Sequence, residues 1–206
     1  MRSRYPYRVR VIPPVPADIR LLGITGSPGV GKSTLAAALG LPVIPMDGFH
    51  YADVELERRR LLHSKGSPDT FDAEGYAALL RRVKACEWNV VAPMFDRGLE
   101  QPLAGAIPVP ATGTVVTEGN YLLLNQPRWS AVRAQLDVVW HLVVDDAVRI
   151  ERLVARHVAF GKNPAQARAW VARVDEANAA RIEEAARRAD VVVDLSEWVP
   201  PRTPPA

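Results

Sequence analysis

The most constraining feature of this sequence is the segment GSPGVGKS at residues 26–33, which fits the phosphate-loop pattern G-x-x-x-x-G-K-[ST]. Residues 20–25 before it predict a short buried strand, and residues 33–39 after it predict a helix that Gly40 ends. Glycines let the backbone turn tightly and aim its N–H groups inward, and the helix N-terminus adds partial positive charge. We therefore expect a nucleoside triphosphate to bind here, in preference to a turn that merely joins strand to helix.

Two residues of the loop carry distinct chemistry. Lys32 can reach the β- and γ-phosphates, and the Ser33 hydroxyl can ligate Mg²⁺. ATP and Mg²⁺ are therefore the expected cofactors. The predicted nucleotide-binding residues are Gly26, Ser27, Gly29, Val30, Gly31, Lys32, Ser33 and Thr34.

Short apolar runs alternate with helical patterns along the rest of the chain. Further strands are predicted at residues 41–46, 89–93, 114–117, 138–144 and 191–195, and helices at 53–63, 73–86, 128–136, 145–160 and 164–189. Residues 94–113 are predicted to be irregular, with a small hairpin near 107–109. This alternation indicates an α/β fold of three layers, the P-loop NTPase fold, in which helices cover both faces of a mostly parallel sheet.

The two ends of the chain have a different composition from the middle. Residues 1–19 are basic and proline-rich, and we predict an N-terminal arm in which residues 9–12 either add an edge strand or stay loose. The domain is placed at residues 20–198. Residues 199–206 are predicted to form a disordered tail.

Charge and cysteine content narrow the partners and the compartment. The 26 basic and 23 acidic residues leave a net charge of +3, and the bases are scattered among acids, so no nucleic-acid partner is expected. No apolar run approaches the ~18 residues of a membrane span, and no apolar segment of a signal peptide follows the first arginines. Cys86 is the only cysteine, which excludes an internal disulfide. We predict a cytoplasmic protein with no membrane partner.

Acidic residues follow the predicted strands, where parallel sheets bind their ligands. Asp47 follows the run at 41–46 and is the predicted general base for an attacking hydroxyl, with a turn cap before Gly48 as the alternative. Glu118 follows the run at 114–117 and is predicted to hold Mg²⁺ directly or through water, or to touch substrate. The alternative for Glu118 is an ordinary acid in a turn.

A group of arginines predicts a mobile lid at about residues 149–165. Arg149, Arg152 and Arg156 share one side of a helix, opposite a packing stripe expected partly through Ile150 and Val154. Gly161 and Lys162 follow, as a hinge and a further cation. Such residues can stabilise a transferring phosphoryl group, whereas the alternative is a solvated face paired with Glu151. Among the histidines, His50 is predicted to lie near substrate and His141 in the core.

Several segments together resemble a known family. They are GSPGVGKS (26–33), MDGFH (46–50), KGSPDTFD (65–72), PMFDR (93–97), EGNYLL (118–123), residues 152–157 and the pair Gly161 and Lys162. Their order resembles the uridine kinase, phosphoribulokinase and pantothenate kinase-like family of P-loop kinases over about residues 20–195. The similarity is greatest to the bacterial branch of nucleoside/nucleotide kinase-like, or fructose-transport-system kinase-like, proteins.

The resemblance implies roles for individual residues. Asp47 is implied as the catalytic base, acting with Lys32 and the lid residues Arg152 and Arg156. The acceptor substrate is implied to lie among Lys65, Asp69, Phe71, Phe95, Arg97 and Tyr121. His50 and Glu118 are expected to touch it from their places in the chain alone. Asp175 and Asn178 match a D-x-x-N element that faces the site in this branch.

The favoured function is therefore transfer of the γ-phosphoryl group of ATP to a hydroxyl of a small metabolite. A sugar, a nucleoside and a pantothenate-like molecule all remain open as acceptor, and a homodimer remains open as the assembly. The alternative function is a nucleotide-dependent switch or regulatory binding module, for which only the basic arm at residues 2–10 offers a partner surface.

Overall fold

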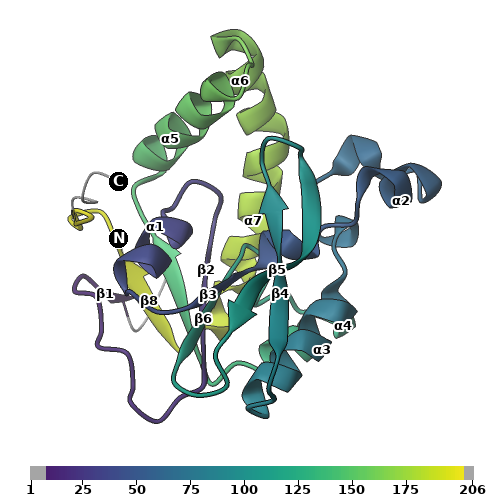
Figure 1. The fold of residues 1–206 in the computed structure, drawn as a ribbon. Helices are drawn as coiled ribbons and strands as arrows, with labels where there is room; N and C mark the ends of the chain where they lie inside the picture. Colours follow the sequence, from purple (N-terminus) through teal and green to yellow (C-terminus); the bar gives the residue numbers. More distant parts are fainter. Residues whose placement is uncertain (1–7, 202–206) are drawn as a thin grey trace.

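The computed structural model describes residues 8–201, and its centre is a parallel β-sheet (Figure 1). Within that range the sheet has six strands in the order β1-β8-β7-β2-β6-β3. They are β1 (Arg8–Val9), β2 (Leu21–Gly26), β3 (Val43–Pro45), β6 (Val115–Glu118), β7 (Val138–Val143) and β8 (Val191–Asp194). The predicted α/β architecture with a mostly parallel sheet is confirmed.

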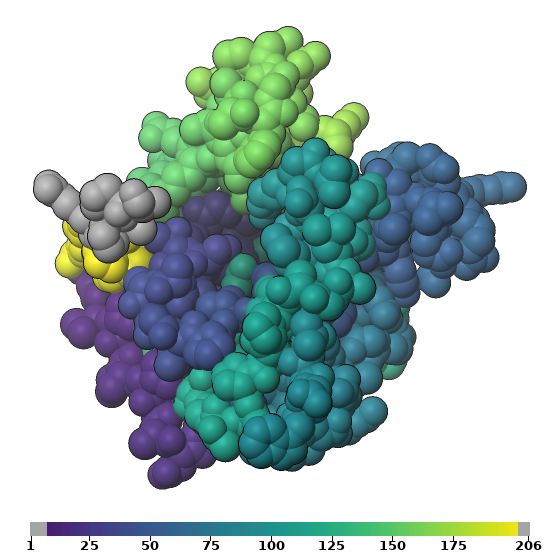
Figure 2. All heavy atoms as spheres, in the orientation of Figure 1, coloured from purple at the N-terminus to yellow at the C-terminus, as the bar shows by residue number. Residues whose placement is uncertain are grey.

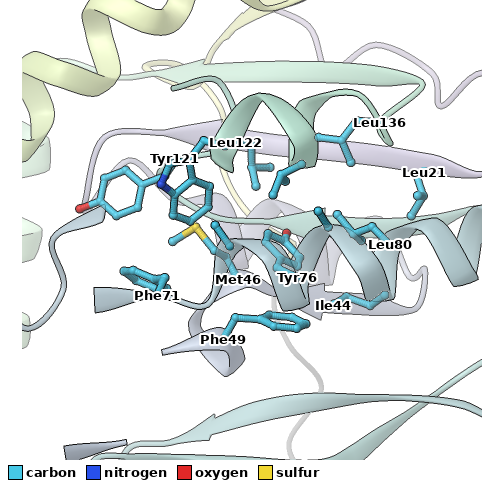
Figure 3. Packing of buried hydrophobic residues seen from close by; sticks show 14 of the residues in the cluster. Leu21, Ile44, Met46, Phe49, Phe71, Tyr76, Leu80, Tyr121, Leu122 and Leu136 are labelled. Atoms are coloured by element: carbon cyan, nitrogen blue, oxygen red, sulfur yellow. The ribbon is translucent and has the colours of Figure 1, made fainter. Parts of the chain in front are cut away.

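Alternating side chains of the central strands pack into two separate hydrophobic cores. Leu21 enters one core and Leu22 the other, because successive residues of a strand point to opposite faces. The first face is covered by α3 (Ala73–Lys84), α4 (Pro127–Arg133) and α7 (Glu176–Ala185), and the second by α1 (Lys32–Ala38). Figure 3 shows the first core, where Met46, Tyr76 and Leu80 gather. Both faces of the strands are therefore apolar, as the continuous apolar runs predicted.

Helices α5 (Asp146–Ala159) and α6 (Pro164–Trp170) project from the sheet as a helical hairpin (Figure 1). Gly161 lies between them with φ 94°, and Asn163 and Gln166 form a capping box that starts α6. The helix predicted over 164–189 is one helical run, but a π-helical turn at Val171–Asp175 interrupts it before α7. Among the described residues, no helix combines the length and apolarity needed to cross a membrane.

A two-stranded antiparallel sheet replaces the irregular segment predicted at residues 94–113. It consists of β4 (Val90–Asp96) and β5 (Gln101–Val109), with a register shift between Ala92 and Met94. The hairpin predicted near 107–109 is present, but the irregular structure predicted for most of the segment is wrong. Two prolines and a glycine in β5 conceal its strand pattern, and a two-stranded ribbon tolerates prolines because each of its strands is an edge strand. The helix predicted over 53–63 is also shorter, since α2 ends at Arg58 and Arg60 has φ 59°.

The basic segment before the first central strand is attached to the last strand. Strand β1 adds to the sheet edge beside β8, the first of the two alternatives for the arm. Arg8 pairs with Asp194 at 2.7 Å, and Arg10 pairs with Glu197 at 2.8 Å. Residues 1–7 of the predicted arm and residues 202–206 of the predicted tail lie outside the described range.

The turn that carries Asp47 packs against strand β4 through a glycine, and this contact predicts a stability effect. A Cβ atom added at Gly48 would lie 2.4 Å from the carbonyl oxygen of Pro93, a backbone atom that cannot rotate away. We expect Gly48→Ala to lower the free energy of unfolding by about 1–3 kcal/mol, measured by urea denaturation.

The control is Gly98→Ala. An added Cβ there would meet only a side-chain oxygen of the exposed Asp96 loop, at 3.3 Å, so a change within about 0.5 kcal/mol is expected. Equal effects of the two substitutions would contradict close packing at Gly48.

Candidate functional site

Three adjacent strands bring the predicted catalytic groups to one edge of the sheet. Glu118, the last residue of β6, lies in register with Ile24 of β2 and Pro45 of β3. The phosphate loop follows β2, and Asp47 lies in the 3₁₀ turn Met46–Phe49 that follows β3. Parallel strands therefore place the loop, Glu118 and Asp47 side by side.

The phosphate loop is folded around its own lysine. Lys32 donates hydrogen bonds from Nζ to the carbonyl oxygens of Gly26 (2.8 Å) and Ser27 (3.2 Å). Its side chain is buried, and burial lowers its pKa to about 8. Gly29 and Gly31 have φ angles of 81° and 108°, which other residues rarely adopt. The backbone of the loop thus surrounds the Lys32 side chain at the start of α1.

An oxygen pair suited to Mg²⁺ stands beside the loop. The Ser33 hydroxyl donates to Oε1 of Glu118 at 2.9 Å, and burial raises the pKa of Glu118. Hydroxyl and carboxylate oxygens are the ligands that this ion prefers, and it normally keeps several waters and takes oxygens from phosphates. No group of three His, Cys, Asp or Glu side chains within residues 8–201 could hold a metal alone. These residues fit an ion that arrives with a nucleotide.

Asp47 is held in place by two neighbours. Arg97 donates from Nη2 to Oδ2 of Asp47 at 3.3 Å, and His50 donates from Nδ1 to the carbonyl oxygen of Asp47 at 2.9 Å. Burial lowers the pKa of His50. The Asp47 side chain keeps 37% of its surface exposed, so a substrate can reach the carboxylate.

A single cavity of about 870 Å³ connects these groups. Figure 2 shows the surface hollowed between the green lid, helix α1 and the teal hairpin β4–β5. Of the predicted site residues, the cavity is lined by Gly29, Val30, Gly31, Lys32, Ser33, Thr34, Asp47, His50, Lys65, Phe71, Phe95, Arg97, Glu118, Arg152, Arg156 and Asn178. The phosphate loop and the residues implied for the acceptor therefore face one space.

Four predicted residues do not line the cavity. Gly26 and Ser27 do not line it, although the carbonyl oxygen of Gly26 accepts a hydrogen bond from Nζ of Lys32. Asp69 is exposed outside the cavity. Tyr121 is fully buried behind Phe71, with its ring in edge contact with Phe71 and its hydroxyl donating to the carbonyl of Gly66. Tyr121 thus supports the wall of the cavity from within.

Aromatic rings and a paired cation form one part of the cavity wall. The His50 ring lies 3.9 Å from that of Phe71 and 4.9 Å from that of Phe95, between centroids. Lys65 binds Oδ1 of Asp53 at 2.6 Å and the carbonyl of Glu100 at 2.6 Å. This wall combines flat apolar surfaces with hydrogen-bonding groups.

The arginines of α5 do not act as one group. Arg149 is 4% exposed and pairs with Asp146 (3.0 Å) and with Glu176 (2.7 Å), so it joins α5 to α7. The expectation that it belongs with the lid charges is wrong. The packing face runs through Arg149 and Leu153, whereas Ile150 and Val154, predicted to pack, are only partly buried. The i, i+3 spacing does not specify how a helix is rotated against its neighbours. Arg152 and Arg156 are exposed and face the cavity.

Some lining residues escaped the sequence reasoning. His157 contacts Oδ2 of Asp175 at 2.9 Å and links α5 to the π-helical turn. Trp198 lines the cavity after β8. The only sequence signal for Asp175 is the D-x-x-N resemblance. Trp198 follows the last strand, and ligands of parallel sheets bind at the carboxyl ends of strands, so its position is a signal that could have indicated it.

Comparisons with known proteins agree with this geometry. A protein of Schizosaccharomyces pombe named as a candidate uridine kinase is 37% identical over 158 residues, covering 68% of this chain and 67% of that protein. The pantothenate kinase of Limosilactobacillus reuteri is 33% identical over 142 residues, 61% of this chain and 44% of the kinase.

Among solved structures, a candidate fructose transport system kinase from Silicibacter sp. TM1040 is 39% identical, with a TM-score of 0.76 over 93% of this chain and 92% of that one. No protein-family model matches the chain. On the similarity to these proteins over most of its length, the chain belongs to the uridine kinase and pantothenate kinase-like family of P-loop kinases.

Proposed function

We propose that this protein transfers the γ-phosphoryl group of ATP to a hydroxyl group of a small metabolite. The observation that carries the proposal is the single cavity lined by both the phosphate loop and the partly exposed carboxylate of Asp47. A site for ATP alone would suit hydrolysis. A carboxylate in the same cavity, beside a wall of aromatic and polar side chains, suits a second substrate.

In the proposed reaction, Asp47 accepts the proton of the acceptor hydroxyl while that oxygen bonds to the γ-phosphorus. The bond between the γ-phosphorus and the bridging oxygen of ADP breaks, and ADP leaves. Lys32, together with the N–H groups of residues 29–33, binds the phosphate oxygens, and Arg152 and Arg156 neutralise charge from the lid. Ser33 and Glu118 would hold Mg²⁺, which when bound to ATP neutralises phosphate charge.

Arg97 gives the acceptor a specific place in this scheme. Its guanidinium group touches Asp47 through one nitrogen at 3.3 Å and keeps 52% of its side-chain surface exposed. It therefore orients the carboxylate and still has donors for an acceptor oxygen. The names of the relatives suggest uridine, pantothenate and fructose as first acceptors to try.

The switch or binding-module function has less support. The predicted partner surface of such a module is the basic arm at residues 2–10. Arg8 and Arg10 of this arm form ion pairs with acidic residues of the same chain. Hydrolysis of ATP without an acceptor, stimulated by another protein, would be the result that favours it over the kinase.

The first test of the kinase function removes the proposed base. Asp47→Asn keeps the shape of the side chain and cannot accept the proton, so we expect acceptor-dependent turnover to fall by about 10²–10⁴-fold while ATP binding persists. ADP release is measured in a coupled assay over sugars, nucleosides and pantothenate, and ATP binding by calorimetry.

The matched control is Asp18→Asn, an exposed aspartate outside the cavity, which should leave turnover unchanged. Retained turnover in Asp47→Asn would remove Asp47 from its role. If no acceptor raises ADP release above the ATPase rate, the kinase proposal fails.

The arginines of α5 provide the second test. Arg152→Ala and Arg156→Ala should each lower turnover by about 10²-fold with little effect on stability, since each removes a charge that faces the cavity. Arg149→Met should instead lower the free energy of unfolding, on the order of 2 kcal/mol, because it breaks the charged hydrogen bond to Glu176 that joins α5 to α7, together with the one to Asp146 within α5.

Turnover and thermal unfolding are measured on all three variants. A large loss of turnover in Arg149→Met without any loss of stability would show that Arg149 acts with Arg152 and Arg156 and would contradict its structural role.

A further inference from the structure

A polar contact lies behind the phosphate loop. Ser27, the second residue of the loop, is 2% exposed and does not line the cavity. Its hydroxyl donates a hydrogen bond to Oε1 of Glu183 at 2.9 Å. The side chain of Ser27 therefore points at a carboxylate of α7, which lies 156 positions further along the chain.

Glu183 is also in contact with the strand next to the loop. The same oxygen, Oε1, lies 3.4 Å from Nε2 of His141, which is fully buried in β7. Strand β7 pairs with β2 so that Thr25 lies opposite His141. The carboxylate thus sits between the start of the loop and the neighbouring strand, with its side chain 23% exposed.

We propose that Glu183 is a positioning residue for the phosphate loop, holding the loop in its phosphate-binding shape through Ser27. The Ser27 carbonyl oxygen accepts from Nζ of Lys32 (3.2 Å) and from the N–H of Val30 (3.2 Å). With the hydroxyl held by Glu183, both polar ends of Ser27 are fixed. The inference rests on the proposed function only in taking a nucleotide phosphate as the ligand.

The need for such a contact follows from the composition of the loop. Gly26, Gly29 and Gly31 all have positive φ angles, and glycine has the largest conformational freedom to lose. A loop that is already ordered loses less entropy when phosphate binds, so the affinity is higher. A hydrogen bond to a carboxylate is about twice as strong as one between neutral groups, which makes Glu183 an effective anchor.

The helical run that carries Glu183 also lines the cavity. Helix α7 continues from the π-helical turn, and Asp175 and Asn178 of this run line the cavity. One helical element therefore contacts the phosphate loop at Ser27 and presents two polar side chains to the cavity.

The experiment measures ADP binding to the full chain by calorimetry, in the presence of Mg²⁺ and without an acceptor. Ser27→Ala and Glu183→Met remove the hydrogen bond from opposite ends, and each should raise the Kd for ADP about tenfold. Glu183→Gln keeps an acceptor oxygen and should raise the Kd by less than about threefold. Glu184→Gln, an exposed neighbour on α7, is the matched control and should leave the Kd unchanged.

The double variant Ser27→Ala/Glu183→Met separates positioning from a general loss of structure. If both changes break one contact, the double variant binds ADP no more weakly than the poorer single variant. Losses that multiply, or folded variants that bind ADP as the wild type does, overturn the proposal. If Glu183→Met does not fold, Ser27→Ala decides by the same criterion. A wild-type chain that binds no ADP would instead overturn the proposed function itself.

Discussion

The parallel pairing of β6 between β2 and β3 is the constraint on which the whole site depends. The register sets Glu118 level with Ile24 and with Pro45, so that the segments after all three strands start from the same edge of the sheet. This register is secured from both faces, because Val115 enters one apolar core and Val116 the other. A slip of one residue would exchange the two faces and separate Glu118 from Ser33.

Within that frame, each of three charged groups at the centre of the site has a polar partner in the protein. Lys32 is bound by loop carbonyls, Glu118 by Ser33, and Asp47 by Arg97. A buried charge without a partner is costly, so these contacts lower the cost of gathering the three charges at one edge of the sheet. Under the proposed function, a bound substrate would take over some of these contacts.

The sequence predicted best the features that depend on residues close together in the chain. The loop at residues 26–33 and the strand β7, predicted at 138–144, depend on neighbouring residues, and both are present. The β4–β5 hairpin was predicted only in part, at residues 89–93 and 107–109, because its strands pair only with each other and carry prolines. Arg149 was misplaced because one of its partners is Glu176, a residue 27 positions away. Contacts of that range leave no periodic signal in the chain.

The long helical run from α6 to α7 shows why the cavity could be only partly predicted. Its sequence reads as one amphipathic helix, yet it joins the lid to the sheet through three different contacts: Asp175 with His157, Glu176 with Arg149, and Glu183 with Ser27. The π-helical turn at Val171–Asp175 inserts an extra residue into this run, which changes the direction in which the residues after it point. Asp175, the last residue of the turn, contacts α5, while Glu183, about two turns further along, contacts the phosphate loop. Spacing along the sequence alone could not have revealed that these acids serve different partners, because the turn interrupts the regular 3.6-residue period that such reasoning assumes.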